Sequence, residues 1–189
     1  MKITSAHFVK GVRGTDEILH DGTPQVAFIG RSNVGKSSLI NALTDIKGLA
    51  KIGKKPGKTT EINLFLVNKA AYIVDLPGYG YAQATPKERE KLKKLIIWYF
   101  TASEARPKEV VIVLDVKAGL TEFDKDMLMI LNEHKHPYMI AVNKCDKLTQ
   151  QEVAAQVAPI REIAGGADVL TCSTKTGKGI DVLRDRLFQ

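Results

Sequence analysis

Two glycines, a lysine and a serine occur in the sequence at a spacing that suits the binding of phosphate groups. They belong to the run Gly30-Arg31-Ser32-Asn33-Val34-Gly35-Lys36-Ser37, which matches the pattern Gly-x-x-x-x-Gly-Lys-Ser. Glycines let the backbone curl until successive N–H groups point at phosphate oxygens, and a helix that starts behind them adds its dipole. Lys36 is expected to reach the β and γ phosphates of a nucleotide, and Ser37 to offer its hydroxyl to Mg²⁺. This loop alone does not distinguish ATP from GTP.

A second candidate loop follows a short apolar run that ends at Asp75. Its sequence is Asp75-Leu76-Pro77-Gly78, and we expect it to lie beside the phosphate loop. Asp75 can hold a water molecule bound to Mg²⁺, because this ion keeps several of its waters when a protein binds it. The N–H of Gly78 can contact a γ phosphate. Lys36 and Gly78 are therefore the candidate catalytic groups.

Two further loops concern the base of the nucleotide. In the run Asn143-Lys144-Cys145-Asp146, the two acceptor oxygens of Asp146 match the N1–H and N2 amino donors of guanine, and adenine offers no such pair. Asn143 can bridge the base edge and the phosphate loop, and the stem of Lys144 can lie across the ring. In the run Cys172-Ser173-Thr174, a backbone N–H can donate to guanine O6. Taken singly, Asp146 or Ser173 is more simply a loop residue, but all four loops in this order predict a GTP site.

The elements that must position these loops alternate between short β-branched runs and helical patterns. Strands are predicted at Gln25–Ile29, Ile62–Val67, Tyr72–Asp75, Val110–Asp115, Tyr138–Val142 and Val169–Thr171. Helix starts are predicted at Thr85, Thr121 and Thr149, each followed three residues later by an acidic side chain. The alternation predicts an α/β domain of three layers, a P-loop GTPase domain with helices on both faces of a six-stranded, mostly parallel sheet. A hairpin at residues 68–71 gives this sheet one antiparallel edge strand. Each candidate loop then lies at the carboxyl end of a strand, where ligands sit in such sheets.

Length and composition predict one globular core. The chain has 189 residues, 44% of them apolar, and we expect a GTP-binding domain at residues 25–189 with residues 1–24 as an extension packed on it. Cys145 and Cys172 give no disulfide framework and no metal-ligand spacing. The first residues lead into no apolar signal region, and the apolar run Leu95–Phe100 is far shorter than the roughly 20 residues that span a bilayer. A cytoplasmic, monomeric protein without a membrane segment is expected.

The net charge of +7 is concentrated in two places. Five lysines occur within twelve residues that contain no acidic side chain, namely Lys47, Lys51, Lys54, Lys55 and Lys58. A second cluster, diluted by Glu88 and Glu90, consists of Lys87, Arg89, Lys91, Lys93 and Lys94. Basic clusters suit a polyanion such as nucleic acid, and the alternative is a solvated face that keeps the protein in solution. We favour the polyanion for the first cluster and the solvated face for the second.

The chain resembles the translation-factor-like GTPases, and within them the EngB family (also called YihA or YsxC), bacterial GTPases linked to large ribosomal subunit assembly and to cell division. The resemblance covers nearly all residues and is carried by "GRSNVGKSSLINAL", "KPGKTTEINLF", "DLPGYGYA" and a basic helix that ends in "WYF". It implies that the nucleotide site also includes Gly57, Lys58, Thr59, Thr60 and Glu61. Thr59 aligns with the threonine that completes the Mg²⁺ shell, and Thr60 is the competing choice.

Two departures from the family pattern occur. Thr60 stands where the family usually has Gln, and Cys172-Ser173-Thr174 stands where Ser-Ser is common. Neither departure removes a group needed for binding, because the contact with guanine O6 is made by the backbone.

The position that carries a water-positioning Gln in many GTPases is Tyr79 here. We find no Arg with an obvious claim to act in cis, so slow intrinsic conversion of GTP and water into GDP and phosphate is expected, accelerated by a partner or an ion. In GTPases that resemble this one, the side chain at the position of Asn33 helps to hold K⁺ beside the phosphates. The switch segments are predicted at residues 46–60 and 78–85, and the first contains the five-lysine cluster.

Two functions from different classes follow. The first is a GTPase switch that docks on the large ribosomal subunit or its rRNA, which the lysine-rich switch segment favours. The second is a GTP-dependent interaction protein of the division machinery, whose partner is a protein and whose hydrolysis is incidental. A P-loop kinase of small molecules is a distant third, because it has no use for the Asn-Lys-x-Asp loop.

Overall fold

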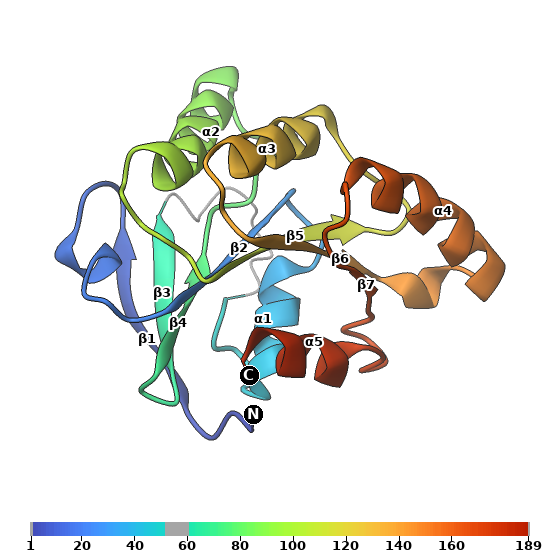
Figure 1. The fold of residues 1–189 in the computed structure, drawn as a ribbon, viewed down its shortest axis with the longest axis horizontal. Coiled ribbons are helices and arrows are strands. Elements are labelled where there is room, and N and C mark those ends of the chain that lie inside the picture. Colours follow the sequence, from blue (N-terminus) through green and yellow to red (C-terminus); the bar gives the residue numbers. More distant parts are fainter. Residues whose placement is uncertain (1, 52–60, 189) are drawn as a thin grey trace.

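In the computed structural model of the protein, residues 2–51 and 61–188 are described, and seven strands among them form one sheet (Figure 1). β3 runs antiparallel to both of its neighbours, whereas the other neighbouring strands are parallel. The loops that follow β2, β4, β6 and β7 therefore start at the same edge of the sheet. In spatial order the strands are β1 (Ala6–Val12), β3 (Ile62–Val67), β4 (Ala71–Asp75), β2 (Gln25–Gly30), β5 (Glu109–Asp115), β6 (Tyr138–Asn143) and β7 (Val169–Thr171).

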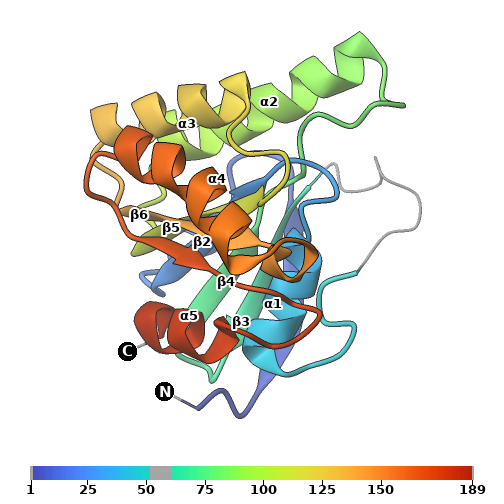
Figure 2. The same cartoon turned by 90° about the vertical axis from the view of Figure 1, so that its right-hand side faces the viewer.

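Helices cover both faces of the sheet (Figure 2). One face packs against α2 (Pro86–Thr101), α3 (Glu122–Glu133) and α4 (Gln150–Ile163). The other face packs against α1 (Lys36–Thr44) and α5 (Ile180–Leu187). Two short 3₁₀ helices, Glu17–Leu19 and Cys145–Lys147, complete the described helical elements. The three predicted layers are confirmed.

The central strands are apolar throughout because both of their faces are covered. In β2, Val26 and Phe28 pack with α1 and α5, while Ala27 and Ile29 pack with the helices of the opposite face. All four side chains are at most 1% exposed. Burial of each large apolar side chain contributes roughly 1.5–3 kcal/mol, so β2 holds the start of the phosphate loop firmly in the core.

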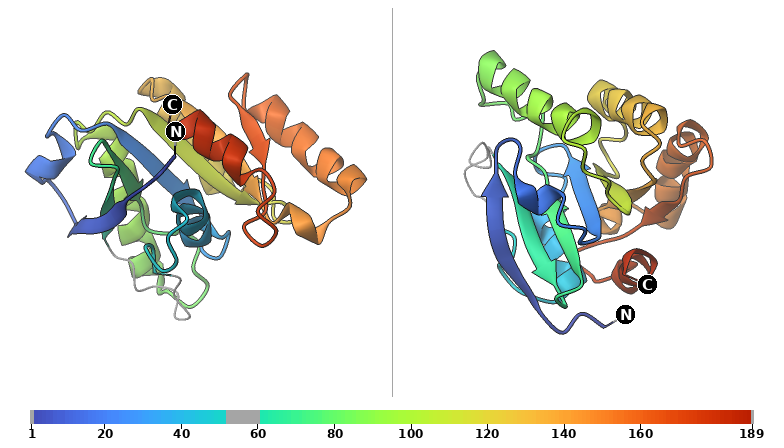
Figure 3. Two further views of the ribbon diagram at one scale, coloured as in Figure 1. Left: turned by 90° about the horizontal axis from the view of Figure 1, so that it is seen from below. Right: turned by 60° about the vertical axis from the view of Figure 1, so that its left-hand side comes forward.

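The sheet has one strand more than the six that the sequence predicts. The additional strand is β1, which pairs with β3 and lies at the outer edge of the sheet (Figure 3). Its pairing is interrupted between Phe8 and Lys10, and Phe8 is 53% exposed. An edge strand buries little side-chain surface, so its sequence lacks the apolar run that reveals the central strands. The division of the chain at residue 24 stays a prediction, since β1 belongs to the same sheet as the strands after it.

The three helix starts are confirmed. Thr85, Thr121 and Thr149 each accept a hydrogen bond from the backbone of the third helical residue, whose acidic side chain accepts one in return. Such reciprocal caps satisfy N–H groups that have no partner inside the helix. Among the described helices, none is both long and apolar enough to cross a membrane.

Candidate nucleotide-binding site

The phosphate loop and the Asp75–Gly78 loop lie against each other. The backbone N–H of Ser32 donates to the carbonyl of Tyr79 at 2.7 Å, and Arg31 and Tyr79 form an isolated parallel bridge. The N–H of Leu76 donates to the carbonyl of Phe28 at 3.1 Å, which fixes the start of the second loop on β2. The structure therefore places the two predicted phosphate-binding loops side by side.

Both glycines of the phosphate loop have a steric reason to be glycine. A Cβ on Gly30 would lie 2.6 Å from the carbonyl oxygen of Val113 on the neighbouring strand. Gly35 is the N-terminal cap of α1 and has a φ of +95°, which side-chain-bearing residues rarely adopt. A Cβ on Gly35 would also overlap the side-chain amide of Asn143. The loop can hold this shape only with these two glycines.

The ammonium group of Lys36 donates to the carboxylate of Asp75. Both residues are buried, with 8% and 5% exposure respectively, and they come from α1 and β4. A buried ion pair of this kind is costly to break by removing one partner. The pair brings together the two side chains that the sequence assigns to phosphate and to Mg²⁺.

The groups near this pair fit a magnesium ion. Ser37 lies in the first turn of α1, directly after Lys36, and Asp75 ends β4. A hydroxyl and a carboxylate are the oxygen donors that Mg²⁺ prefers, and one or two such protein groups suffice when phosphate and water supply the rest. Thr59, the third predicted group, lies outside the described residues, as do Gly57, Lys58 and Thr60.

Asn143 connects the phosphate loop to the last of the four loops. Its side-chain N–H₂ donates to the carbonyl of Val34 at 3.0 Å, and its side-chain oxygen accepts the N–H of Thr174 at 3.2 Å. The residue is 0% exposed. A buried amide that satisfies partners on both sides holds the two loops at a fixed separation. The predicted bridge to the phosphate loop is present.

The side chain of Lys144 lies against the phosphate loop and is fixed at its ammonium end. Its ammonium group donates to the carbonyl of Asn33 and forms an ion pair with Asp115 at 2.8 Å. Burial raises the pKa of the Asp115 carboxyl, but the hydrogen bonds from Lys144 and from the backbone of Lys117, together with the nearby lysine charges, outweigh that effect and the pKa is lowered overall. The stem of Lys144 is thereby stretched over the loop, as stacking on a base would require. Sequence reasoning missed Asp115, whose position at the end of β5 was the available signal.

Asp146 is joined to the last loop by a side-chain bond. The hydroxyl of Ser173 donates to its carboxylate at 2.6 Å, and this bond lowers the pKa of Asp146. The N–H of Cys145 donates to the carbonyl of Cys172 at 3.1 Å, which ties the two loops together. Asp146 is exposed, so its carboxylate is accessible to a base. The role of the Ser173 hydroxyl was missed, because the sequence argument considered only the backbone of this loop.

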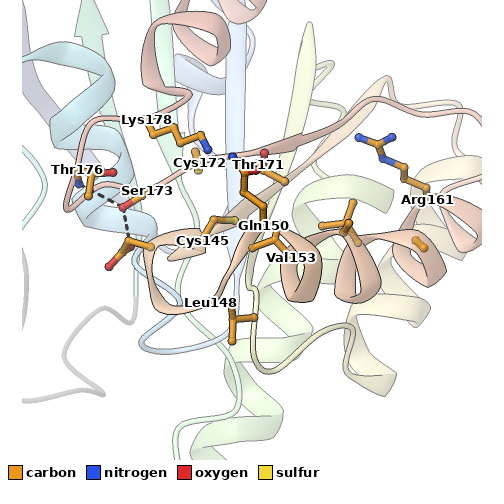
Figure 4. A pocket seen from close by; sticks show the side chains of 14 residues that line it. Cys145, Leu148, Gln150, Val153, Arg161, Thr171, Cys172, Ser173, Thr176 and Lys178 are labelled. Atoms are coloured by element: carbon orange, nitrogen blue, oxygen red, sulfur yellow. Dashed lines mark hydrogen bonds between the residues drawn. The ribbon is translucent and has the colours of Figure 1, made fainter.

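A cavity of about 600 Å³ adjoins these loops between α4 and β7 (Figure 4). Cys145, Val153 and Ser173 are among the residues that line it, with Lys178 and Arg161 as its cations. Because Asp146 and Ser173 line it, the cavity is continuous with the two loops predicted to bind guanine, residues 143–146 and 172–174, which we call the guanine loops.

Glu61 directly precedes β3, in which Asn63 pairs with Asp75 of β4. The carboxylate of Glu61 forms an ion pair with Arg13 at 2.7 Å, at the end of the β1–β3 pair. Its assignment to the nucleotide site stays a prediction. Of the five-lysine cluster, Lys47 and Lys51 are described, and the other three lysines are not.

Comparison with known proteins identifies relatives of the whole chain. Residues 25–144 match the family described as 50S ribosome-binding GTPase. The chain is 41% identical over 180 residues to a probable GTP-binding protein EngB of Chlorobium luteolum, an alignment that covers 95% of this chain and 86% of that protein. A protein of the same name from Aquifex aeolicus is 37% identical over 165 residues, with 87% and 90% covered. The crystal structure of a probable GTP-binding protein engB matches with a TM-score of 0.74 at 30% identity, and the match covers 87% of this chain and 96% of that one.

Proposed function

The chain belongs to the EngB family of GTP-binding proteins and is a GTPase, and we propose that it is a nucleotide-controlled switch in the assembly of the large ribosomal subunit. The observation that carries the proposal is the junction at Asn143, which joins a phosphate loop and a guanine loop through one buried amide. The description of the matched family, a 50S ribosome-binding GTPase, supports the partner. Normal septation would then depend on this protein through the supply of ribosomes.

In the proposed reaction, water attacks the γ phosphate of GTP to give GDP and phosphate. Lys36 is already buried beside the phosphate loop and would exchange its bond with Asp75 for phosphate oxygens, where it offsets negative charge. The N–H of Gly78 would hold the γ phosphate. Mg²⁺, held by Ser37 and through water by Asp75, would neutralise charge on the β and γ phosphates.

Guanine would be recognised by the second pair of loops. The carboxylate of Asp146 would accept from N1–H and the N2 amino group, while the hydroxyl of Ser173 holds that carboxylate in place. Lys144 would cover one face of the base. Adenine presents an acceptor at N1, so ATP would meet the carboxylate with like polarity and be rejected.

The lysine cluster of the first switch segment supports a polyanionic partner. Its described members, Lys47 and Lys51, are both exposed, and the described residues provide neither with an ion-pair partner. Lys54 and Lys55 belong to the part of the cluster outside the described residues. Because this segment follows the phosphate loop helix, nucleotide exchange would alter how the charges are presented to rRNA.

The proposal is tested by loading tagged protein with GTP or GDP and recovering what it binds from a bacterial lysate. Large ribosomal subunits should be recovered with GTP and not with GDP. Recovery of division proteins without ribosomal subunits would instead establish the alternative, a GTP-dependent interaction protein of the division machinery.

A second measurement tests the surface. Neutralising Lys51, Lys54 and Lys55 to Gln should weaken binding to purified subunits and lower the salt slope by roughly 0.7–0.9 for each lost phosphate contact. The matched control neutralises Lys2, Lys69 and Lys135, which are exposed elsewhere on the molecule. Equal salt slopes for the two triple variants would show that the first cluster is only a solvated face.

A further inference from the structure

Tyr79 occupies the position of the water-positioning side chain, yet its own side chain is buried. The residue is 3% exposed. Its ring packs edge-to-face with the ring of Phe123, with ring centroids 4.6 Å apart. Its hydroxyl donates to the carboxylate of Asp124. Burial and the neighbouring carboxylate raise the pKa of Tyr79 well above its ordinary value. The hydroxyl is thus a fixed neutral donor that points into the core under α3.

Asp124 is built into the start of α3. The residue is 1% exposed, and its second carboxylate oxygen accepts the N–H of Thr121 at 2.7 Å and the hydroxyl of Thr121 at 2.5 Å. It is also the acidic member of the helix cap. A buried carboxylate needs donors on both oxygens, and Tyr79 supplies the one that the cap does not. Removal of the Tyr79 hydroxyl would leave that oxygen unpaired.

The backbone of Tyr79 is attached on the opposite side. Its carbonyl accepts the N–H of Ser32 of the phosphate loop at 2.7 Å. Gly78 lies directly before it, and a Cβ on Gly78 would lie 3.2–3.4 Å from atoms of Ser32. The Gly78–Tyr79 segment is therefore clamped between the phosphate loop and the N-terminus of α3.

We infer that Tyr79 is a positioning residue for GTP hydrolysis, which acts by anchoring the Gly78 N–H to the rigid start of α3 through its bond with Asp124. The inference rests on the proposed contact between that N–H and the γ phosphate. The Tyr79 side chain holds the loop from behind and does not approach the attacking water. A fixed donor near the γ phosphate stabilises developing charge without reorganisation during the reaction.

Tyr79→Phe keeps the ring against Phe123 and removes the anchoring bond. We expect single-turnover hydrolysis to fall about tenfold, which is the size of effect that losing a hydrogen bond to a charged group produces. GDP affinity should stay within about twofold, because GDP has no γ phosphate for Gly78 to contact. The preference for a non-hydrolysable GTP analogue over GDP should fall with the rate.

Tyr99→Phe is the matched control. Tyr99 is also a fully buried tyrosine of the same core, and its hydroxyl donates to the side-chain oxygen of Gln25 at 2.7 Å, away from the site. The Tyr99→Phe variant should have a lower melting temperature, with an unchanged rate of GTP hydrolysis and an unchanged GTP-to-GDP preference. If Tyr79→Phe affects hydrolysis no more than Tyr99→Phe does, the inference is wrong.

Two further variants separate the inference from the proposed site. Asp124→Ala, which removes the acceptor of the Tyr79 hydroxyl, combined with Tyr79→Phe should slow hydrolysis no more than the larger single effect, because both changes delete the same bond, and additive losses would overturn the anchor. Gly78→Ala should slow hydrolysis on its own. If both Gly78→Ala and Tyr79→Phe hydrolyse GTP at the wild-type rate, the proposed role of Gly78 is wrong and the anchor is wrong with it. If only Tyr79→Phe keeps the wild-type rate, the anchor alone is wrong.

Discussion

The phosphate half of the site is shaped by glycines and main-chain contacts, whereas the guanine half is joined by side-chain hydrogen bonds. Gly30 and Gly35 leave no room for a Cβ, and the buried Lys36–Asp75 pair lies beside them. On the guanine side, Asp146 is exposed and is held by the hydroxyl of Ser173. A change in the phosphate half therefore creates an overlap that cannot relax, while a change in the guanine half removes one bond of several. The following substitutions test this difference.

Gly35→Ala should have the largest effect. The new Cβ would meet the side chain of Asn143 and would force alanine to a φ near +95°. Strain of about 1–3 kcal/mol together with the disrupted bonds of Asn143 predicts a fall of about a thousandfold in affinity for GDP and GTP alike. Titration with a fluorescent nucleotide measures it.

Gly22→Ala is the control for that substitution. Gly22 has a comparable φ of +83° but open space around its missing Cβ. It should lower stability slightly and leave nucleotide affinity intact. If the two alanine variants bind GDP equally well, steric fit does not govern the phosphate half.

Asp146→Asn should have the next largest effect, on specificity. The amide offers one acceptor and one donor where guanine requires two acceptors, so GTP affinity should fall about a hundredfold. Xanthosine triphosphate, whose 2-oxo group requires a donor, should gain affinity. Competition between the two nucleotides measures the change, and unchanged GTP affinity with no gain for XTP would disprove the assignment of this loop.

Ser173→Ala should weaken GTP binding about fivefold, since one of several bonds is lost. The hydroxyl lowers the pKa of Asp146, so its removal raises that pKa toward the ordinary value of 3.8. Binding needs the ionised carboxylate and is lost as pH falls through the pKa. The acidic limb of the affinity profile should therefore move to higher pH in the variant. Thr176→Ala serves as control, because Thr176 contacts Ser173 through its backbone N–H; an unshifted limb in Ser173→Ala would contradict the prediction.

Asn33 tests a further side chain of the phosphate half, one that takes no part in the buried Lys36–Asp75 pair, and its effect should be the smallest. Its φ is +69°, so the residue is explained equally by the turn alone. If its side chain helps to hold K⁺, hydrolysis should be severalfold faster in KCl than in NaCl at equal ionic strength, and Asn33→Ala should remove the difference while sparing GDP binding. Asn33→Gly keeps the turn without strain. If the glycine variant keeps the potassium effect, the Asn33 side chain does not hold K⁺ and its only role is to suit the turn.

The same contrast explains what the sequence could predict. The phosphate loop could be predicted because consecutive residues, Gly30 to Ser37, determine its backbone shape. The strands around it could be predicted because burial on both faces requires apolar runs. The guanine loops were identified by side-chain chemistry at Asp146 and Asn143. A short strand is possible in residues 1–24 from the sequence, but β1 could not be placed there because an edge strand leaves side chains such as Phe8 exposed.

Contacts between distant segments could not be predicted. Tyr79 and Asp124 are 45 positions apart, and neither carries a local pattern that reveals the other. The ion pair between Glu61 and Arg13 is a second contact that no local pattern reveals. Pairings of this kind depend on packing across the whole domain, which no short stretch of sequence encodes.

The junction at Asn143 can form only late in the synthesis of the chain. Asn143 contacts Val34, made 109 positions earlier, and Thr174, made 31 positions later. A ribosome produces the phosphate loop first, and that loop has no guanine partner until most of the remaining chain has been translated and has left the exit tunnel. A chain that ends before Thr174 lacks this junction, so its phosphate loop is not yet joined to the last loop. We therefore expect the complete site to form only after the last of the four loops has been translated.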